Sequence, residues 1–144
     1  MDLPVRPTLS IEAAKAIAES AKSYATDQGY GSLIVLVLDA GGHLLYLERQ
    51  DGVPPGPIQV AYLKARSAAM FEVPSKIFEE TVADGLVGLI GLPGMAAFEG
   101  AAPIFHAGKL VGAIGVSGLT KELDGEIAQA GADALPEILG RLSS

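Results

Sequence analysis

The chain of 144 residues has a length typical of one domain, and its 49% hydrophobic and 19% charged residues exclude intrinsic disorder. Glycine, proline or a charged residue interrupts every apolar run before it reaches the roughly 20 residues that cross a bilayer, so we expect no membrane partner. The net charge of −7 without a basic cluster argues against nucleic acid, and the absence of cysteine excludes disulfides, cysteine-based zinc sites and thiol catalysis.

The N-terminal residues differ from a secretory signal, because an acid and two prolines stand where basic and then continuous apolar residues are required. We therefore expect a cytoplasmic protein. The mean hydropathy of +0.37 is high for a small domain, which has limited interior for apolar side chains. We expect homo-oligomers whose interfaces cover this surface; the alternative is that alanine and glycine account for the excess.

The first part of the chain predicts a helix followed by a hairpin. Ser10 is a suitable N-cap, and Gly29 ends the helix. Residues 32–38 are typical of a strand buried on both faces, residues 39–43 supply a tight turn, and residues 44–49 return as the partner strand.

Two helices are predicted next. The proline- and glycine-rich segment 51–57 is a loop, and Pro57 starts a helix that reaches Phe71. Ser75 is the expected N-cap of a short helix through Ala83, and the glycine-spaced stretch 85–94 has no assigned conformation.

A second hairpin and a last helix complete the pattern. Residues 101–105 and 110–116 flank a turn at residues 106–109, Thr120 caps the helix, and Pro136 kinks or restarts it. Because hairpins make antiparallel pairs, the sequence predicts an α+β fold, with a mainly antiparallel sheet and helices packed on it. No linker or repeat divides residues 1–144, which we expect to form one domain.

Three segments resemble the GlcG/HbpS family. Residues 38–52, Leu-Asp-Ala-Gly-Gly-His-Leu-Leu-Tyr-Leu-Glu-Arg-Gln-Asp-Gly, resemble its V-D-x-G-G-x-L…R-x-D-G stretch. Residues 64–68, Lys-Ala-Arg-Ser-Ala, resemble its K-A-R-T-A helix, and residues 112–118, Gly-Ala-Ile-Gly-Val-Ser-Gly, followed by Asp124, resemble its G-A-I-G-V-S-G strand and terminal helix. The match runs in order from about Ser10 to Gly131.

This resemblance implies a profilin-like antiparallel sheet of about five strands flanked by helices, and assembly from dimers up to octamers. Some family members bind haem, one branch is fused to cobalamin adenosyltransferases, and others accompany glycolate or aromatic-compound catabolism. The haem-binding members use a histidine in the first helix or a threonine elsewhere. The first helix here, residues 11–28, has neither histidine nor methionine, so haem is a possible but disfavoured cofactor.

The two histidines, His43 and His106, each fall in a predicted turn without a partner at metal-ligand spacing. Solvated turn residues are the expected interpretation, with haem or metal ligation as the alternative, and we predict no metal site. No group of acids has the alternating spacing of a calcium loop.

Ser117 and Gly118 are candidate ligand-binding residues. They form a strand end and a glycine turn before a helix N-terminus, where backbone N–H groups and the helix dipole favour an anion. The alternative is a simple capping turn. The spacing of the glycines differs from that of the G-x-S-x-G motif of serine hydrolases.

Three basic residues are further ligand-binding candidates. Lys64 and Arg66 point about 200° apart on one helix, so we expect only one of them to face a ligand. Arg49 stands with Asp51 beside the proline-rich loop, where it could face a cleft or form an ion pair that fixes the loop.

For proton transfer the candidates are Glu99, Asp51 and His43. Glu99 lies in an apolar stretch that would raise its pKa and suit a general base, or it is a solvent-facing turn residue. Three functions follow: a small-ligand-binding protein that holds a small organic acid or a tetrapyrrole, a catabolic enzyme that acts on a small carboxylate by acid/base chemistry, or a non-catalytic accessory subunit.

Overall fold

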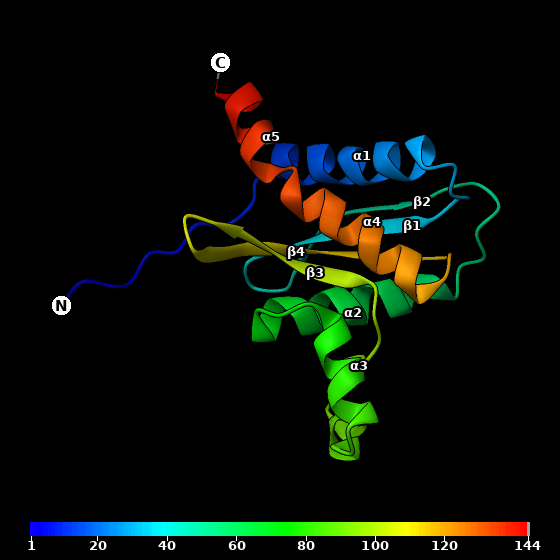
Figure 1. The fold of residues 1–144 in the computed structure, drawn as a ribbon. Helices are drawn as coiled ribbons and strands as arrows, with labels where there is room; N and C mark the ends of the chain where they lie inside the picture. Colours follow the sequence, from blue (N-terminus) through cyan, green and yellow to red (C-terminus); the bar gives the residue numbers. More distant parts are fainter. Residues whose placement is uncertain (144) are drawn as a thin grey trace.

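The structure is a computed structural model that describes residues 1–143, and it consists of one four-stranded sheet with helices on both faces (Figure 1). In chain order the elements are α1 (Ile11–Asp27), β1 (Ile34–Asp39), β2 (Leu44–Arg49), α2 (Pro57–Phe71), α3 (Ser75–Ala83), the 3₁₀ helix η1 (Val87–Gly91), β3 (Ala101–His106), β4 (Lys109–Ser117), α4 (Lys121–Asp133) and α5 (Leu135–Leu142). The predicted succession of helix, hairpin, two helices, hairpin and helix is confirmed.

The sheet has the strand order β2-β1-β4-β3, and every neighbouring pair is antiparallel. This confirms the α+β class. The expected count of about five strands is wrong, because the described residues form four. Each hairpin contributes two strands, and residues 87–91 of the unassigned glycine-spaced stretch form η1 instead of a further strand.

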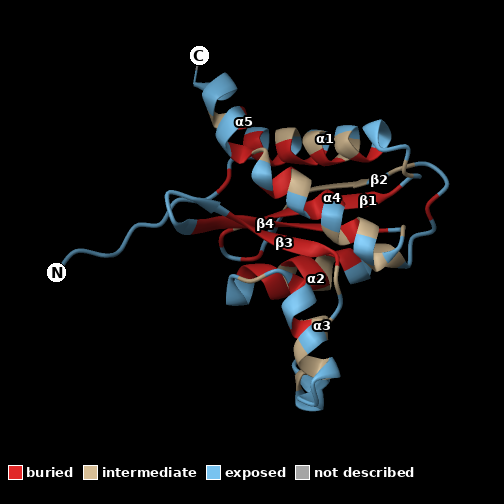
Figure 2. Cartoon of the chain, in the orientation of Figure 1, coloured by how far each residue is buried: buried red, intermediate tan, exposed pale blue. Residues whose placement is uncertain are grey.

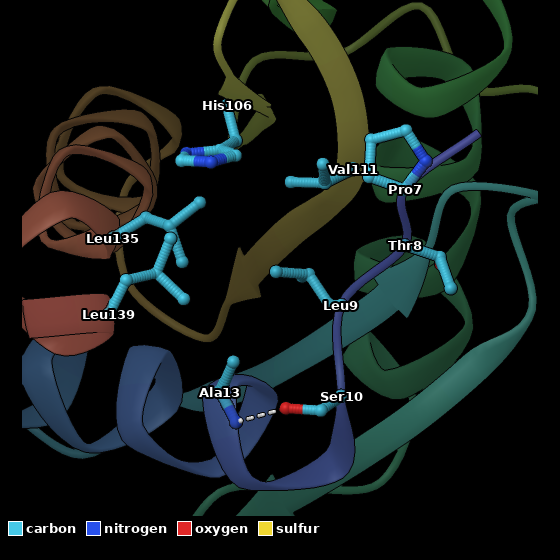
Figure 3. Close-up of a pocket in the computed structure, with 9 residues that line it drawn as sticks. All are labelled: Pro7, Thr8, Leu9, Ser10, Ala13, His106, Val111, Leu135 and Leu139. Carbon is cyan, nitrogen blue, oxygen red and sulfur yellow. Dashed lines mark hydrogen bonds between the residues drawn. The ribbon is translucent and has the colours of Figure 1, made fainter. Parts of the chain in front are cut away.

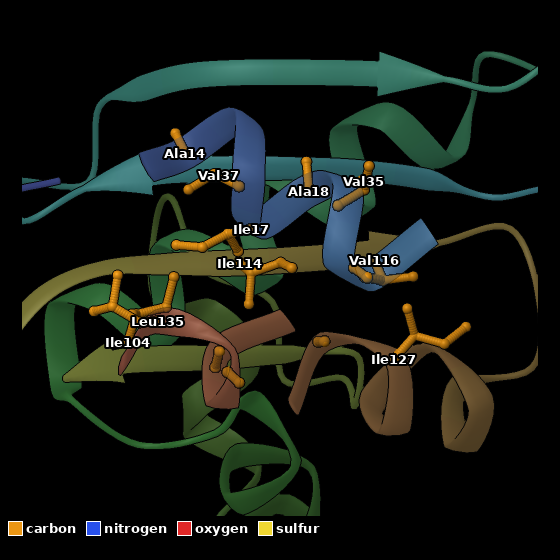
Figure 4. Packing of buried hydrophobic residues seen from close by; sticks show 14 of the residues in the cluster. Ala14, Ile17, Ala18, Val35, Val37, Ile104, Ile114, Val116, Ile127 and Leu135 are labelled. Carbon is orange, nitrogen blue, oxygen red and sulfur yellow. The ribbon is translucent and has the colours of Figure 1, made fainter. Parts of the chain in front are cut away.

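The central strand β1 is buried on both faces, as its continuous apolar run predicts. Val35 and Val37 belong to the core on the α1 and α4 side of the sheet, together with Ile17, Ile114 and Ile127 (Figure 4). The alternate residues of β1 pack toward α2: Ile34, Leu36 and Leu38. Two hydrophobic cores therefore share one sheet, which Figure 2 shows as a buried layer between the helices.

Small residues let α2 lie directly against the sheet. Ala61, Ala65 and Ala68 of α2 are fully buried on this face. On β4, Gly115 lies so close to α2 that an added Cβ would collide with the carbonyl oxygen of Ala61. The close approach of the α2 backbone to β4 thus depends on the absence of a side chain at Gly115.

At the helix ends, one expectation is wrong and one is confirmed. Ser75 is not an N-cap: Pro74 occupies that position, and Ser75 begins α3. The Ser75 hydroxyl instead accepts a hydrogen bond from the Ala101 N–H at 3.0 Å, which ties α3 to β3. Pro136 restarts the C-terminal helix as predicted, since it lies in the first turn of α5.

α3 and η1 project away from the sheet (Figure 1). Leu86, Val87 and Ile90 on this projection are each more than half exposed. Such apolar exposure suits an interface, and self-association stays a prediction. Within residues 1–143, no helix combines the length and apolarity that a membrane span requires.

The contact between α2 and β4 predicts a selective loss of stability. Gly115→Ala should lower the free energy of unfolding by roughly 1–3 kcal/mol, because the new methyl group pushes α2 from the sheet. Urea denaturation measures this change. In the control, Gly140→Ala in α5, the added Cβ meets no atom within 4 Å, and about 0.5–1 kcal/mol of stabilisation is expected. Equal stabilities of the two variants would contradict the described packing.

Candidate functional site

A cleft of about 270 Å³ lies where β4 ends and α4 begins. Residues of α2, of the loop before β3, of the end of β4 and of α4 line it: Pro57, Val60, Lys64, Phe98, Ser117, Gly118, Leu119 and Asp124. This volume is just below the range of pockets that hold drug-sized molecules, so the cleft suits a small ligand.

Lys64 of α2 is fully buried at the base of this cleft. Its Nζ donates hydrogen bonds to the carbonyl oxygens of Val116 at 2.6 Å and Glu99 at 3.2 Å. The space for the ammonium comes from Gly100, where φ is 136° and an added Cβ would collide with Nζ. A glycine at position 100 is therefore a requirement for a lysine at position 64.

Asp124 in the first turn of α4 provides the countercharge. Its Oδ2 is 3.7 Å from Lys64 Nζ, and its Oδ1 accepts a hydrogen bond from the Leu119 N–H at 3.2 Å. Burial lowers the pKa of Lys64 and raises the pKa of Asp124, since loss of solvent disfavours both charged forms. Both shifts lie in the direction that eases transfer of a proton from Lys64 to Asp124.

Ser117, the last residue of β4, presents an unpaired hydroxyl. The residue is 3% exposed, and its Oγ has no hydrogen-bond partner among residues 1–143. Beside it α4 begins, with Thr120 as the N-cap that accepts the Leu123 N–H at 3.3 Å. The N–H groups of Lys121 and Glu122 lack intrahelical partners, as at any helix N-terminus. The cleft therefore contains the Ser117 hydroxyl, and the first turn of α4 adjoins it through Leu119 and Asp124.

Further charged and aromatic groups surround the cleft. Lys121 Nζ forms an ion pair with Glu79 at 2.8 Å, and Glu79 also accepts the Glu99 N–H at 3.3 Å. The ring of Phe98 lies 5.7 Å from Lys64 Nζ and 6.0 Å from Lys121 Nζ, within cation–π range. The surroundings of the ammonium are thus partly apolar and partly acidic.

Of the predicted ligand-binding residues, the structure brings together Lys64, Ser117 and Gly118 in this cleft. Arg66 diverges from Lys64, as the helical spacing predicts, and lies beside the β1–β2 turn and the loop before β3. An added Cβ on Gly94 would lie 3.0 Å from Arg66 Nε, and one on Gly42 would lie 3.8 Å from its guanidinium. Arg66 therefore does not line the cleft.

The remaining predicted residues also lie outside the cleft lining. Arg49 and Asp51 are exposed, and no ion pair within the described part of the chain joins them. The His43 side chain is 80% exposed, with Nδ1 3.3 Å from an Asp39 carboxylate oxygen in the same turn. Glu99 is near the cleft, where its Oε2 would lie 2.9 Å from a Cβ added to Gly125 of α4.

His106 lies at the edge of a second, smaller cavity of about 170 Å³ (Figure 3). The cavity is on the α1 and α5 side of the sheet, and apolar side chains dominate its lining, among them Leu9, Val111, Leu135 and Leu139. His106 itself is exposed. Across residues 1–143, no three histidine, aspartate or glutamate side chains gather closely enough to hold a metal ion.

Sequence reasoning missed Asp124 as a site residue. Its position in the first turn of a helix is ordinary for an acid, because an acid there interacts favourably with the helix dipole. The available signal was its place after the strand-to-helix turn, within the segment that resembles the GlcG/HbpS family. Its pairing with Lys64, 60 positions earlier, is a property of the fold alone.

The Lys64–Asp124 pair predicts strong energetic coupling. Lys64→Met and Asp124→Asn should each cost roughly 3–5 kcal/mol of unfolding free energy, because each leaves a buried charge without its partner. The double variant should lose less than the sum, by about 0.5–3 kcal/mol in urea denaturation. As a matched control, the exposed pair Lys76–Glu80 should show a coupling of only about 0.3–0.5 kcal/mol. Additive losses at positions 64 and 124 would contradict a coupled pair.

Comparisons with known proteins agree on one family. A family model described as "Haem degrading protein HbpS-like" matches residues 9–133. Protein GlcG of Escherichia coli K12 is 36% identical over 109 residues, which span 76% of this chain and 81% of GlcG.

Solved structures share the fold. Klebsiella pneumoniae ORFY has a TM-score of 0.88 at 26% identity, over 94% of this chain and 96% of ORFY. A variant of Streptomyces reticuli HbpS has a TM-score of 0.84 at 31% identity, over 92% of this chain and 90% of the HbpS chain. PduOC, solved as a heme complex, has a TM-score of 0.78 at 22% identity, over 88% of this chain and 94% of the PduOC chain. At this identity the similarity concerns the fold alone. With the family match across residues 9–133 and the 36% identity to GlcG, the chain belongs to the HbpS-like family.

Proposed function

We propose that this protein binds a small organic acid in the cleft between α2, β4 and α4. The observation that carries the proposal is the Ser117 hydroxyl, which is buried, unpaired among the described residues and part of the cleft lining. A buried polar group without a partner is costly, and a carboxylate oxygen in the cleft would accept its hydrogen bond.

The start of α4 supports an anionic ligand. Backbone N–H groups at a helix N-terminus point outward, and the helix dipole favours negative charge there. Gly118 and Leu119, which connect Ser117 to the N-cap of α4, line the cleft, so the positive end of the helix dipole lies beside the Ser117 hydroxyl. Two of the three N–H donors of Lys64 are used by Val116 and Glu99, and Asp124 lies 3.7 Å from Nζ, so the ammonium contributes positive charge at the base of the cleft.

The proposal predicts opposite effects of one substitution on stability and binding. Ser117→Ala should leave the free protein as stable or more stable, because it removes an unpaired buried hydroxyl. It should weaken binding of a short acid by about 10- to 150-fold, the loss of one hydrogen bond to a charged group. Thermal shift identifies binders among lactate, pyruvate and benzoate, and calorimetric titration gives Kd.

Arg66→Ala serves as the matched control. Its guanidinium lies beside Gly42 and Gly94 and outside the cleft lining, so binding should be unchanged. Loss of binding in Arg66→Ala with retention in Ser117→Ala would move the site to the other side of α2. A screen in which only neutral or cationic compounds raise Tm would contradict an anion site and favour the accessory-subunit function.

A tetrapyrrole is the second candidate ligand. It is favoured by the family's description as haem degrading and by the heme complex of the structural neighbour PduOC. In this chain the best location is the apolar cavity beside His106, whose imidazole could approach a haem iron. At about 170 Å³ this cavity is well below the size of pockets that enclose large ligands, so a macrocycle would remain largely outside it.

Titration with hemin separates the two candidates. We expect no saturable shift of the Soret band at stoichiometric hemin, because neither cavity encloses a macrocycle and both histidines are exposed. A sharp one-to-one shift that is lost in His106→Ala and kept in His43→Ala would contradict this expectation and favour the tetrapyrrole.

A further inference from the structure

Lys64 has a chemical capability that binding alone does not use. We propose that the ligand of the cleft is a 2-oxo acid, and that the Lys64 amine condenses with its carbonyl group to form an imine. This inference rests on the proposed function, which places the carboxylate of the ligand at Ser117 and the start of α4. It adds the class of ligand and the bond that forms.

The position of Nζ relative to Ser117 supports the proposal. Lys64 Nζ contacts the carbonyl oxygen of Val116 at 2.6 Å, and Ser117 is the next residue along β4. Both Lys64 and Ser117 line the same cleft. A carboxylate held by the Ser117 hydroxyl would therefore have its neighbouring carbon close to Nζ. In a 2-oxo acid that carbon is a carbonyl carbon, which is the atom an amine attacks.

The surroundings of Lys64 suit a nucleophile. Only the unprotonated amine has a free electron pair, and an apolar environment favours this form. Lys64 is fully buried, and Pro57, Val60 and Phe98 supply apolar walls of the cleft. The Asp124 carboxylate, 3.7 Å from Nζ, is placed to accept the proton. Burial also lowers the pKa of Lys64 and raises the pKa of Asp124, and both shifts lie in the direction that eases this transfer.

The step balances without an oxidant or reductant. The Lys64 ammonium gives one proton to Asp124, and the nitrogen electron pair forms a bond to the carbonyl carbon as the C=O π pair moves onto oxygen. The oxygen takes the proton from Asp124 and a second proton from nitrogen, and the C–O bond breaks to release water. The products are a protonated imine, which keeps one N–H, and one water molecule.

The site can stabilise this product. A protonated imine retains its positive charge, which Asp124 offsets, and its single N–H can still donate to the Val116 carbonyl oxygen. The contact with Glu99 is given up, because the imine nitrogen has fewer hydrogens than an ammonium. A purely structural lysine would instead keep all of its contacts and would be unreactive.

Reductive trapping tests the proposal on the whole chain. The protein is incubated with pyruvate and cyanoborohydride, which converts an imine into a stable amine, and is then digested for peptide mass spectrometry. The expected result is one carboxyethyl group on the peptide that contains Lys64, with little on the peptides of the other lysines. Modification spread over the exposed lysines, or absent at Lys64, would overturn the proposal.

Variants of the protein test whether the trapped adduct depends on Lys64. Lys64→Arg should lose the trapped adduct, and exposed Lys109→Arg should retain it. Because Lys64→Arg could unfold the protein, Ser117→Ala provides a second readout in a variant expected to stay folded: the target lysine remains, and trapping should slow because the ligand carboxylate loses its hydrogen bond. Full-rate trapping in Ser117→Ala would contradict the placement of the ligand carboxylate beside Lys64.

Lactate distinguishes failure of this inference from failure of the proposed function. It has the size and carboxylate of pyruvate but no carbonyl group to trap. A rise in Tm with lactate, together with no trapping of pyruvate, would overturn the imine and leave the binding function in place. If neither acid raises Tm and pyruvate is not trapped, both the inference and the proposed function fail.

Discussion

The ion pair between Lys64 and Asp124 determines the organisation of one end of this protein. Moving two charges out of water costs several kcal/mol for each ion, so a buried pair is tolerated only with good geometry and further hydrogen bonds. Here the ammonium reaches two carbonyl oxygens and the carboxylate accepts a backbone N–H. These contacts tie α2, the loop before β3, the end of β4 and the start of α4 together, and the cleft lies among them.

Local sequence patterns predicted most of the fold because its turns carry strong signals. Glycine-containing turns fix both hairpins, and Pro57 and Pro136 mark helix starts. The fifth strand was expected from the family resemblance, and no local pattern supported it. Ser75 was misassigned for a related reason: its hydroxyl could serve the helix end or a distant backbone group, and only the fold places Ala101 within reach.

The site was predictable in part. Lys64 shares a helical face with Ala61 and Ala68, so the spacing alone indicates that a charged residue lies on the buried face of α2. Its partner was not, because an acid in the first turn of a helix is ordinary on the surface and its burial depends on packing between distant elements. The family relationship identifies the fold, and a fold alone does not determine function.

The two members of the pair belong to opposite layers, since α2 covers one face of the sheet and α4 covers the other. Separating the layers to open the cleft would leave an ammonium buried without its carboxylate, a state high in free energy. A ligand would therefore enter at the exposed side of the cleft. There the partly exposed side chains of Phe98 and Val60 can change rotamer on picosecond to nanosecond timescales. Under the proposed binding function, the residence time of a ligand would be set by its own contacts and not by separation of the two layers.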